Sequence, residues 1–489
     1  MKIETKVANS FLLSLLVMLL AACGGGGGGG GGGATSDIGT GAVGLTLTDK
    51  PADLAEIDKI LITITAVEIF AEDGSKVTLY NGRPRGPFDL LELEHESRPL
   101  VYDPDVPVGT YCKIRLTLSD LELVFNNGDE RFHPRLPGNN KLDLNPKDCF
   151  QVTADSKLYL QLDMDAKSIH VVQTGNKKHY NFRPVVFIDV IQRDVQTKLV
   201  RLENGLIDEI DSDAGTLLLC EFSYGDNARG EPEDCMTILI SRQTSAFDNV
   251  DDDGINEISN GDAISLADLL VQGRVGTTPV TVVGRFSEAE PEEGTYPVID
   301  ALVVELGGFL NLEGTVASGA SDIRFNMNVD PDQGISTEGE LPVALQAAPA
   351  GGNGTKILSR TGEVLSSSDI TPPRQVMVDG VLQLPDPSFL NASLVIVDLS
   401  DDMEKDEASG TIVELVDPDG LRVEADSFPC EVGTGVFNVS YDSQTNVYDS
   451  ILPDVGWVDT DALSPRQEVD IIGVCEGTTL AASSIIIRE

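Results

Sequence analysis

An acidic loop between residues 249 and 262 is the stretch of this chain whose spacing fits a metal site. Its sequence runs Asn-Val-Asp-Asp-Asp-Gly-Ile-Asn-Glu-Ile-Ser-Asn-Gly-Asp. Calcium loops place oxygen ligands at positions 1, 3, 5, 7 and 12, and glycine at position 6 permits the sharp turn that brings alternate residues to one ion. The corresponding ligands here are Asn249, Asp251, Asp253, the carbonyl group of Ile255, Asn260 and, as a substitute ligand, Asp262.

Position 12 of this loop departs from the calcium pattern. Asn260 stands where a bidentate Glu is usual, so the predicted calcium site is weak. The alternative interpretation is a solvated acidic loop, because the later repeats described below lack the pattern. Calcium is the cofactor that the sequence suggests.

Catalytic motifs are missing from the chain. The sequence contains no GxSxG, HExxH or Walker loop, and its four His residues are not spaced to converge on a metal or a base. We therefore expect a protein that is not an enzyme.

Residues 41–191 form the first predicted unit. Apolar and polar residues alternate over 43–48, 60–69, 114–118 and 159–164, which is typical of strands with one wet face. The fold class we predict is all-β. It comprises an N-terminal antiparallel β-sandwich over 41–191, followed by three small β-barrel or β-sandwich repeats.

Several phrases in this unit carry a family resemblance. They are Leu47-Thr-Asp49-Lys-Pro51-Ala, Phe88-Asp-Leu-Leu91, Val106-Pro-Val-Gly109-Thr-Tyr111, Ile114-Arg-Leu116, Leu162-Asp163-Met-Asp165-Ala, Thr174-Gly175 and Phe182-Arg-Pro184-Val. Together they resemble the bacterial lipoprotein family labelled DUF4382. The resemblance implies an exported β-rich domain with no established activity. Met164 departs from the family, which usually has an aromatic residue there.

The resemblance also suggests a functional cluster. Asp49, Asp163 and Asp165 match acidic positions of the family, and alternate residues on a strand share one face. Paired carboxylates could act as acid and base, which would make the protein an envelope hydrolase, although the sequence offers no nucleophile. The plainer alternative is that Asp49 caps the turn before Pro51 while the other two face water.

The remainder of the chain repeats every 90–110 residues, over 203–307, 310–400 and 408–489. Each unit opens with a Gly-led strand and closes with a strand that ends on Gly, followed by a β-branched strand. A strand ending on Gly allows a tight barrel corner. The closing motif resembles DUF5666-type modules, which implies small β-barrels of exported proteins.

Six of the seven cysteines lie after residue 41, where the first unit begins. They fall in neighbouring pairs within the candidate units, so among fifteen possible connectivities we predict the three local ones. The predicted disulfides are Cys112–Cys149, Cys220–Cys235 and Cys430–Cys475.

The seventh cysteine lies at the end of a leader. An apolar run over 11–20 is too short to span a bilayer, which takes roughly 20 helical residues, but suits a secretory signal. Leu20-Ala-Ala-Cys23 resembles the bacterial lipobox, which implies removal of residues 1–22 and acylation of Cys23. Residues 23–40, with ten consecutive glycines, form a predicted flexible tether. The alternative is an ordinary signal peptide with a chance cysteine.

Charge and leader together indicate where the protein acts. The net charge of −46 repels nucleic acid and anionic lipid, so we expect no nucleic-acid partner. Gly24 rather than Asp follows the cysteine, which favours the outer membrane, with the protein facing the periplasm or the cell surface. We expect a lipid-anchored, non-catalytic binding or structural module of the cell envelope, whose partner is a protein or a polysaccharide.

Overall fold

The computed structural model describes most of the chain after residue 38. The described residues are 39–49, 57–94, 96–125, 131–134, 140–144, 146, 149–165, 169–174, 177–182, 185–191, 199–224, 229–232, 234–250, 260–287, 296–330, 333, 339–383, 388–399, 406–416, 419–425, 430, 435–442, 445–449 and 456–488. The predictions on the signal peptide (1–22), on Cys23 and on nearly all of the tether (23–40) therefore fall outside the described residues.

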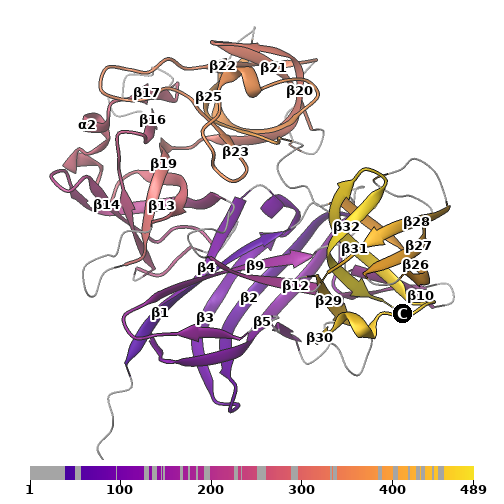
Figure 1. The fold of residues 1–489 in the computed structure, drawn as a ribbon. Helices are drawn as coiled ribbons and strands as arrows, with labels where there is room; N and C mark the ends of the chain where they lie inside the picture. Colours follow the sequence, from indigo (N-terminus) through magenta and orange to yellow (C-terminus); the bar gives the residue numbers. More distant parts are fainter. Residues whose placement is uncertain are drawn as a thin grey trace, which may run out of the picture. The chain divides into compact units, whose positions relative to one another are not determined.

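The first unit contains two sheets packed on one core, as predicted, and a separate two-stranded sheet formed by residues 169–174 and 177–182 (Figure 1). Its strands are β1 (Thr40–Asp49), β2 (Ile57–Ala71), β3 (Lys76–Asp89), β4 (Glu96–Pro107), β5 (Gly109–Phe125), β6 (Arg131–Phe132), β7 (Lys141–Leu144), β8 (Phe150–Val152), β9 (Lys157–Asp165), β10 (Ile169–Thr174), β11 (Lys177–Phe182) and β12 (Val185–Ile191), with the 3-10 turn η1 at Leu91–Glu94. One sheet contains β12-β9-β1-β4, and the other contains β3-β2-β5-β6 with β7 and β8 also on β5.

Alternation of side chains explains why these segments form strands. Ile60, Ile62 and Ile64 of β2 are fully buried, while the residues between them are partly exposed. Leu45 and Leu47 of β1 lie in the same core. The pairing of β1 with β9 is parallel, whereas β1 and β4 pair antiparallel.

Three barrels follow. The strands of the first barrel and its flanking segments are β13 (Leu199–Asp211), β14 (Thr216–Cys220), β15 (Cys235–Leu239), β16 (Ser245–Asn249), β17 (Asp262–Ile264), α2 (Leu266–Leu269), η3 (Gln272–Arg274), β18 (Pro279–Phe286) and β19 (Val298–Gly307). The second barrel has β20 (Leu310–Ser321), β21 (Arg324–Val329), β22 (Leu341–Leu345), β23 (Lys356–Ser359), η5 (Ser367–Asp369), β24 (Gln375–Gln383) and β25 (Phe389–Val397). The third has β26 (Asp406–Val416), β27 (Gly420–Ala425), β28 (Gly435–Ser440), β29 (Asn446–Asp449), β30 (Gly456–Val458), η6 (Thr460–Ala462), β31 (Glu468–Glu476) and β32 (Thr479–Ile487).

The three barrels share one strand pairing. In the second barrel β20 pairs with β21, β21 with β22, β22 with β25, β25 with β24, and β24 with β20, which closes the ring seen in Figure 1. The β22–β25 pairing is parallel and the others are antiparallel. The ring β13-β14-β15-β19-β18 and the ring β26-β27-β28-β32-β31 repeat this pattern. A closed five-stranded barrel in the ring order 1-2-3-5-4 is the arrangement of the OB-fold.

A glycine marks the same corner in each barrel. At Gly380 the register of β24 against β25 shifts, and a Cβ there would lie 2.6 Å from the carbonyl oxygen of Asn391. Gly284 and Gly473 occupy the matching bulges, where a Cβ would meet a backbone oxygen at 2.4 and 2.2 Å. A residue without a side chain is needed at this corner.

The first unit and the first barrel are continuous. Strand β4 pairs in parallel with β13 through Glu96 and Leu199, so the two units share an 11-stranded sheet. Their buried residues also form a single hydrophobic cluster. The second and third barrels have their own clusters.

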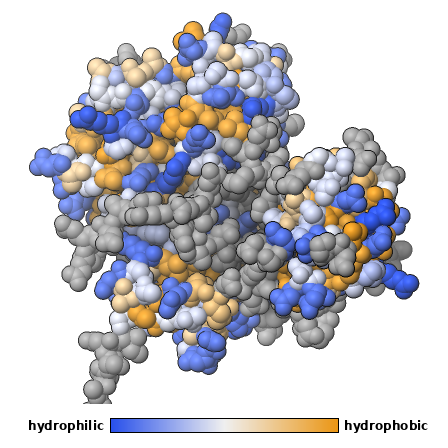
Figure 2. Space-filling view, in the orientation of Figure 1, coloured by the Kyte–Doolittle hydropathy of each residue, from blue (hydrophilic) through white to orange (hydrophobic). Residues whose placement is uncertain are grey.

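Hydrophilic and apolar areas lie side by side on the visible surface. Figure 2 shows hydrophilic residues over much of the visible face, with apolar residues gathered in smaller areas between them.

Candidate functional site

The three predicted disulfides are confirmed. Cys112 bonds to Cys149, Cys220 to Cys235, and Cys430 to Cys475, each within one structural unit.

The predicted acidic cluster of the first unit lies on two neighbouring strands. Asp49 pairs with Met164 of β9, whereas Asp163 pairs with Thr48 of β1. Asp165 pairs with Val185 of β12. The side chains of Asp49 and Asp165 are outside the described part of the structure, so the cluster stays a prediction.

The predicted calcium loop is described only at its ends. Asp251, Asp253 and Ile255 lie outside the described residues. Asn249 ends β16, and its side-chain amide donates to the carbonyl oxygen of Gly308. Asp262 begins β17.

The second barrel holds the far end of the same loop. The carbonyl oxygen of Asn260 accepts hydrogen bonds from Gln383 (3.1 Å) and Asn391 (2.9 Å). The side chain of Gln346 binds the residues on both sides of Asp262. Its amide nitrogen donates to the carbonyl oxygen of Gly261, and its amide oxygen accepts from the backbone nitrogen of Ala263. The loop therefore starts and ends at fixed points.

The described residues include a buried network of charged side chains that the sequence analysis did not predict. Arg201 of β13 is 3% exposed, and its Nη2 atom lies 2.6 Å from Oδ2 of Asp379 on β24. Its Nε atom donates to Glu96 of β4. The other oxygen of Asp379 accepts from Asn311 at 2.8 Å. One guanidinium therefore ties together the first unit, the first barrel and the second barrel.

Two further carboxyl groups adjoin Arg201. Glu203, two residues along β13, forms an ion pair with Arg98 at 2.7 Å. Glu305 of β19 is 1% exposed and accepts a hydrogen bond from the hydroxyl group of Ser393 on β25. We call Glu96, Arg98, Arg201, Glu203, Glu305, Asp379 and Ser393 the junction network.

Burial and the neighbouring charges together set the pKa values of these groups. Burial raises the pKa of Glu305 well above its usual value, and the nearby Asp379 carboxylate raises it further. Burial also raises the pKa of Glu96 and of Asp379, against the opposing effect of Arg201. Burial alone would lower the pKa of Arg201, but Asp379 and Glu96 outweigh it and the pKa rises. For Glu203, Arg98 and Arg201 overcome burial and lower the pKa.

A second polar contact joins the first unit to the first barrel. The guanidinium of Arg85 lies between the rings of Tyr80 (3.7 Å) and Tyr224 (4.0 Å). Its Nη2 atom reaches both oxygens of Asp234 at 2.9 and 3.1 Å. Asp234 directly precedes Cys235, so the disulfide fixes the strand that presents this carboxylate.

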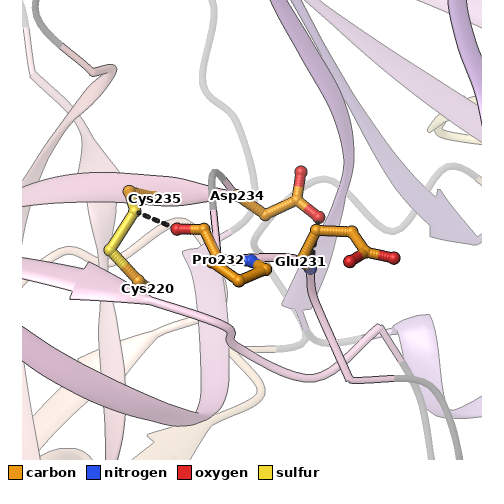
Figure 3. Close-up of a disulfide and its surroundings, with 5 residues drawn as sticks. All are labelled: Cys220, Glu231, Pro232, Asp234 and Cys235. Carbon is orange, nitrogen blue, oxygen red and sulfur yellow. Dashed lines mark hydrogen bonds between the residues drawn. A yellow bond between two sulfur atoms is a disulfide. The ribbon is translucent and has the colours of Figure 1, made fainter. Parts of the chain in front are cut away.

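Figure 3 shows how the turn before this disulfide is held. The backbone nitrogen of Glu231 donates to the Asp234 carboxylate, and the backbone nitrogen of Asp234 donates back to Glu231. The dashed line joins Sγ of Cys235 to the carbonyl oxygen of Pro232 at 3.1 Å. Because this sulfur is bonded to Cys220, it carries no hydrogen, and the contact is a sulfur–oxygen approach rather than a donated hydrogen bond.

The sequence does contain a signal that could have predicted buried charges in the junction network. Arg201, Glu305 and Asp379 each interrupt an apolar run, in Leu-Val-Arg-Leu, Val-Val-Glu-Leu and Met-Val-Asp-Gly. A charge inside a run of buried strand residues must find a partner, because an unpaired buried charge is costly. The sequence does not say which partner, since the contacts span 105 and 178 residues.

Metal-binding clusters are absent from the described residues. Among them, His, Cys, Asp and Glu side chains form no group of three or more that could hold a metal ion. Within the same described part, no helix is both long and apolar enough to cross a bilayer. What the geometry provides is cross-linking of units.

Fold and contacts define a class: an all-β protein in which a two-sheet domain continues into three OB-type barrels, the first and third of which carry a disulfide. The comparison with known families is consistent with this class. Residues 40–184 match the family model described as "Domain of unknown function (DUF4382)", which confirms the resemblance of the first unit. Neither a curated protein nor a solved structure matches the chain.

Proposed function

We propose that this protein is an exported, lipid-anchored binding or structural module of the cell envelope and does not catalyse a reaction. The observation that supports the proposal most directly is the complete pairing of the six cysteines after Cys23. Stable disulfides form in oxidising compartments outside the cytosol. Cys23, at the end of a signal-like leader, is the cysteine left for acylation.

The junction network supports a structural role. An active site needs ionisable groups that a substrate can reach, whereas Arg201, Asp379 and Glu305 are at most 3% exposed. Arg201 bonds to Asp379, and Glu305 accepts a hydrogen bond from Ser393, in each case between the first and the second barrel. These perturbed groups join units rather than face a ligand.

The barrels supply surfaces for binding. Barrels of the OB-type bind ligands through strand faces and loops, so a string of three presents several such surfaces. The DUF5666-like character of the repeats and a weak calcium site at Asn249, Asp251, Asp253, Ile255, Asn260 and Asp262 belong to this proposal. The partner we propose is an envelope protein or polysaccharide, and the location is the outer membrane.

Membrane fractionation tests the anchor. With its own leader in a Gram-negative host, the wild-type chain should remain with membranes after a high-salt wash and should incorporate labelled palmitate. Cys23→Ser should be released and unlabelled, because the acyl chains are the strong apolar anchor. A Cys23→Ser variant that still sediments would contradict the proposal.

Crosslinking on intact membranes tests the binding role. We expect the wild-type chain to capture the same envelope protein or polysaccharide in repeated experiments. An unrelated control protein of similar net charge should not capture it. Turnover of a substrate by purified protein, lost in Asp163→Asn, would instead favour the hydrolase.

A further inference from the structure

The first and second barrels dock through a buried apolar layer that is bordered by the carboxyl groups of Asp379 and Glu305. The layer consists of Leu199, Phe247, Val283, Val303, Leu358, Met377, Leu394 and Ile396, all buried. Val303 and Glu305 alternate onto the same face of β19, and Glu305 contacts Ser393 across the docking surface. An acid therefore lies at the edge of an apolar interface.

The junction network has more acids than cations close to Glu305. Arg201 is already bonded to Glu96 and to Asp379, and Arg98 is bonded to Glu203. Glu305 receives its hydrogen bond from a neutral hydroxyl group. A carboxylate at this position would face Asp379 without a guanidinium of its own, and like charges at low dielectric repel strongly.

We propose that Glu305 carries a proton at neutral pH, that this neutral acid allows the first barrel to dock on the second, and that loss of the proton in alkali loosens the docking. The device couples the arrangement of the barrels to the pH outside the cell.

Every element packed against Glu305 contributes to this balance. The charged groups that act on it are Asp379 from β24, Arg201 from β13 and Glu96 from β4, while Glu203 and Arg98 pair with each other. The residues beside it in register are uncharged: Thr281 on β18 and Phe247 on β16. Asp248 of β16 pairs with Arg274 at 2.7 Å, and Arg285 of β18 is exposed.

The direction of the pH effect follows from linkage. The pKa of Glu305 is raised in the folded protein, chiefly by burial. Its contribution to docking is therefore complete below the unfolded-state pKa of about 4.3 and is lost as the pH rises through the folded-state value. Between these two pKa values, each pH unit increases the equilibrium constant for opening by about tenfold, and above the folded-state value the increase stops.

Amide hydrogen exchange of the whole protein tests the proposal. Peptides from β24 and β25 report on the docked barrel, and peptides from β31 and β32 of the third barrel serve as an internal reference that cancels base catalysis of exchange. From pH 6.5 to 9.5, exchange of β24 and β25 relative to this reference should rise by about tenfold or more in the wild type.

Two variants show whether Glu305 causes this pH-dependent rise in exchange. Glu305→Gln mimics the protonated acid and should abolish the rise. Glu203→Gln, a change at a partly exposed glutamate of the network whose pKa is lowered, should retain it. A rise that persists in Glu305→Gln, disappears in Glu203→Gln, or is absent from the wild type would overturn the proposal.

A measurement on the unaltered protein covers the case in which Glu305→Gln does not fold. Infrared difference spectra of the wild type between pH 6.5 and 9.5 should show the loss of a protonated carboxylic acid band. A wild type whose carboxyl groups are all ionised at pH 6.5 would refute the neutral acid without any variant.

Discussion

Nη2 of Arg201 in the first barrel lies 2.6 Å from Oδ2 of Asp379 in the second, and both side chains are almost completely buried. The two residues are 178 positions apart in sequence. A buried ion pair of this kind is expensive to break from one side, because the remaining charge has neither water nor partner. It therefore makes the relation between these barrels specific.

Removing one partner of this pair should destabilise the protein strongly. Asp379→Leu takes away one of the two carboxylates that bond to the buried Arg201 guanidinium and leaves only Glu96, and we expect the free energy of unfolding to fall by about 3–5 kcal/mol in urea titrations. The combined variant Arg201→Met, Glu96→Gln, Asp379→Leu should recover most of the loss, since no buried charge of the triad remains. A single variant as stable as the wild type would show that the pair contributes little.

Arg85 should be sensitive even to a conservative change. Arg85→Lys keeps the charge but loses the planar contact with Tyr80 and Tyr224 and the two-oxygen contact with Asp234. We expect a loss of about 1–3 kcal/mol in the free energy of unfolding.

Arg83→Lys is the matched control, because Arg83 pairs with Glu231 of the same turn but its side chain is 78% exposed. Exposed pairs contribute little, so this variant should change stability by less than about 1 kcal/mol. Equal effects of the two substitutions would argue against a special role for Arg85.

The barrel corner at Gly380 should reject a methyl group. Gly380→Ala places Cβ 2.6 Å from a backbone oxygen, so β24 or β25 must shift, at a cost of about 1–3 kcal/mol. Gly319→Ala in the same barrel meets nothing within 4 Å and should be within about 0.5 kcal/mol of the wild type. Urea midpoints of the two variants distinguish the outcomes, and a tolerated Gly380→Ala would mean that the bulge relaxes easily.

The acidic loop should respond weakly to calcium. The missing Glu at position 12 predicts a Kd of about 10⁻⁴–10⁻³ M. Calcium at ten times the Kd should stabilise the folded protein by about 1.4 kcal/mol, seen as a higher Tm, with magnesium as the control ion. A response equal for both ions, or one that survives Asp251→Ala with Asp253→Ala, would leave a solvated acidic loop.

The sequence by itself determined the local features of this protein. Alternating residues over 60–69 predicted β2. The glycines expected to end the closing strands, Gly284, Gly380 and Gly473, do mark corners, but as bulges inside β18, β24 and β31, which continue beyond them. The cysteines pair within units, so neighbours in sequence predicted the bonds. These features depend on the conformational preferences of a few adjacent residues, which the chain carries wherever it folds.

Only the tertiary structure decided how the units join. The charge of Arg201 is visible in its apolar strand, but its partners Glu96 and Asp379 lie in different units. Glu305 likewise interrupts an apolar run, but its partner Ser393 lies in the second barrel. Which buried charges meet depends on the packing of whole sheets, because no sequence period encodes contacts between side chains more than a hundred residues apart.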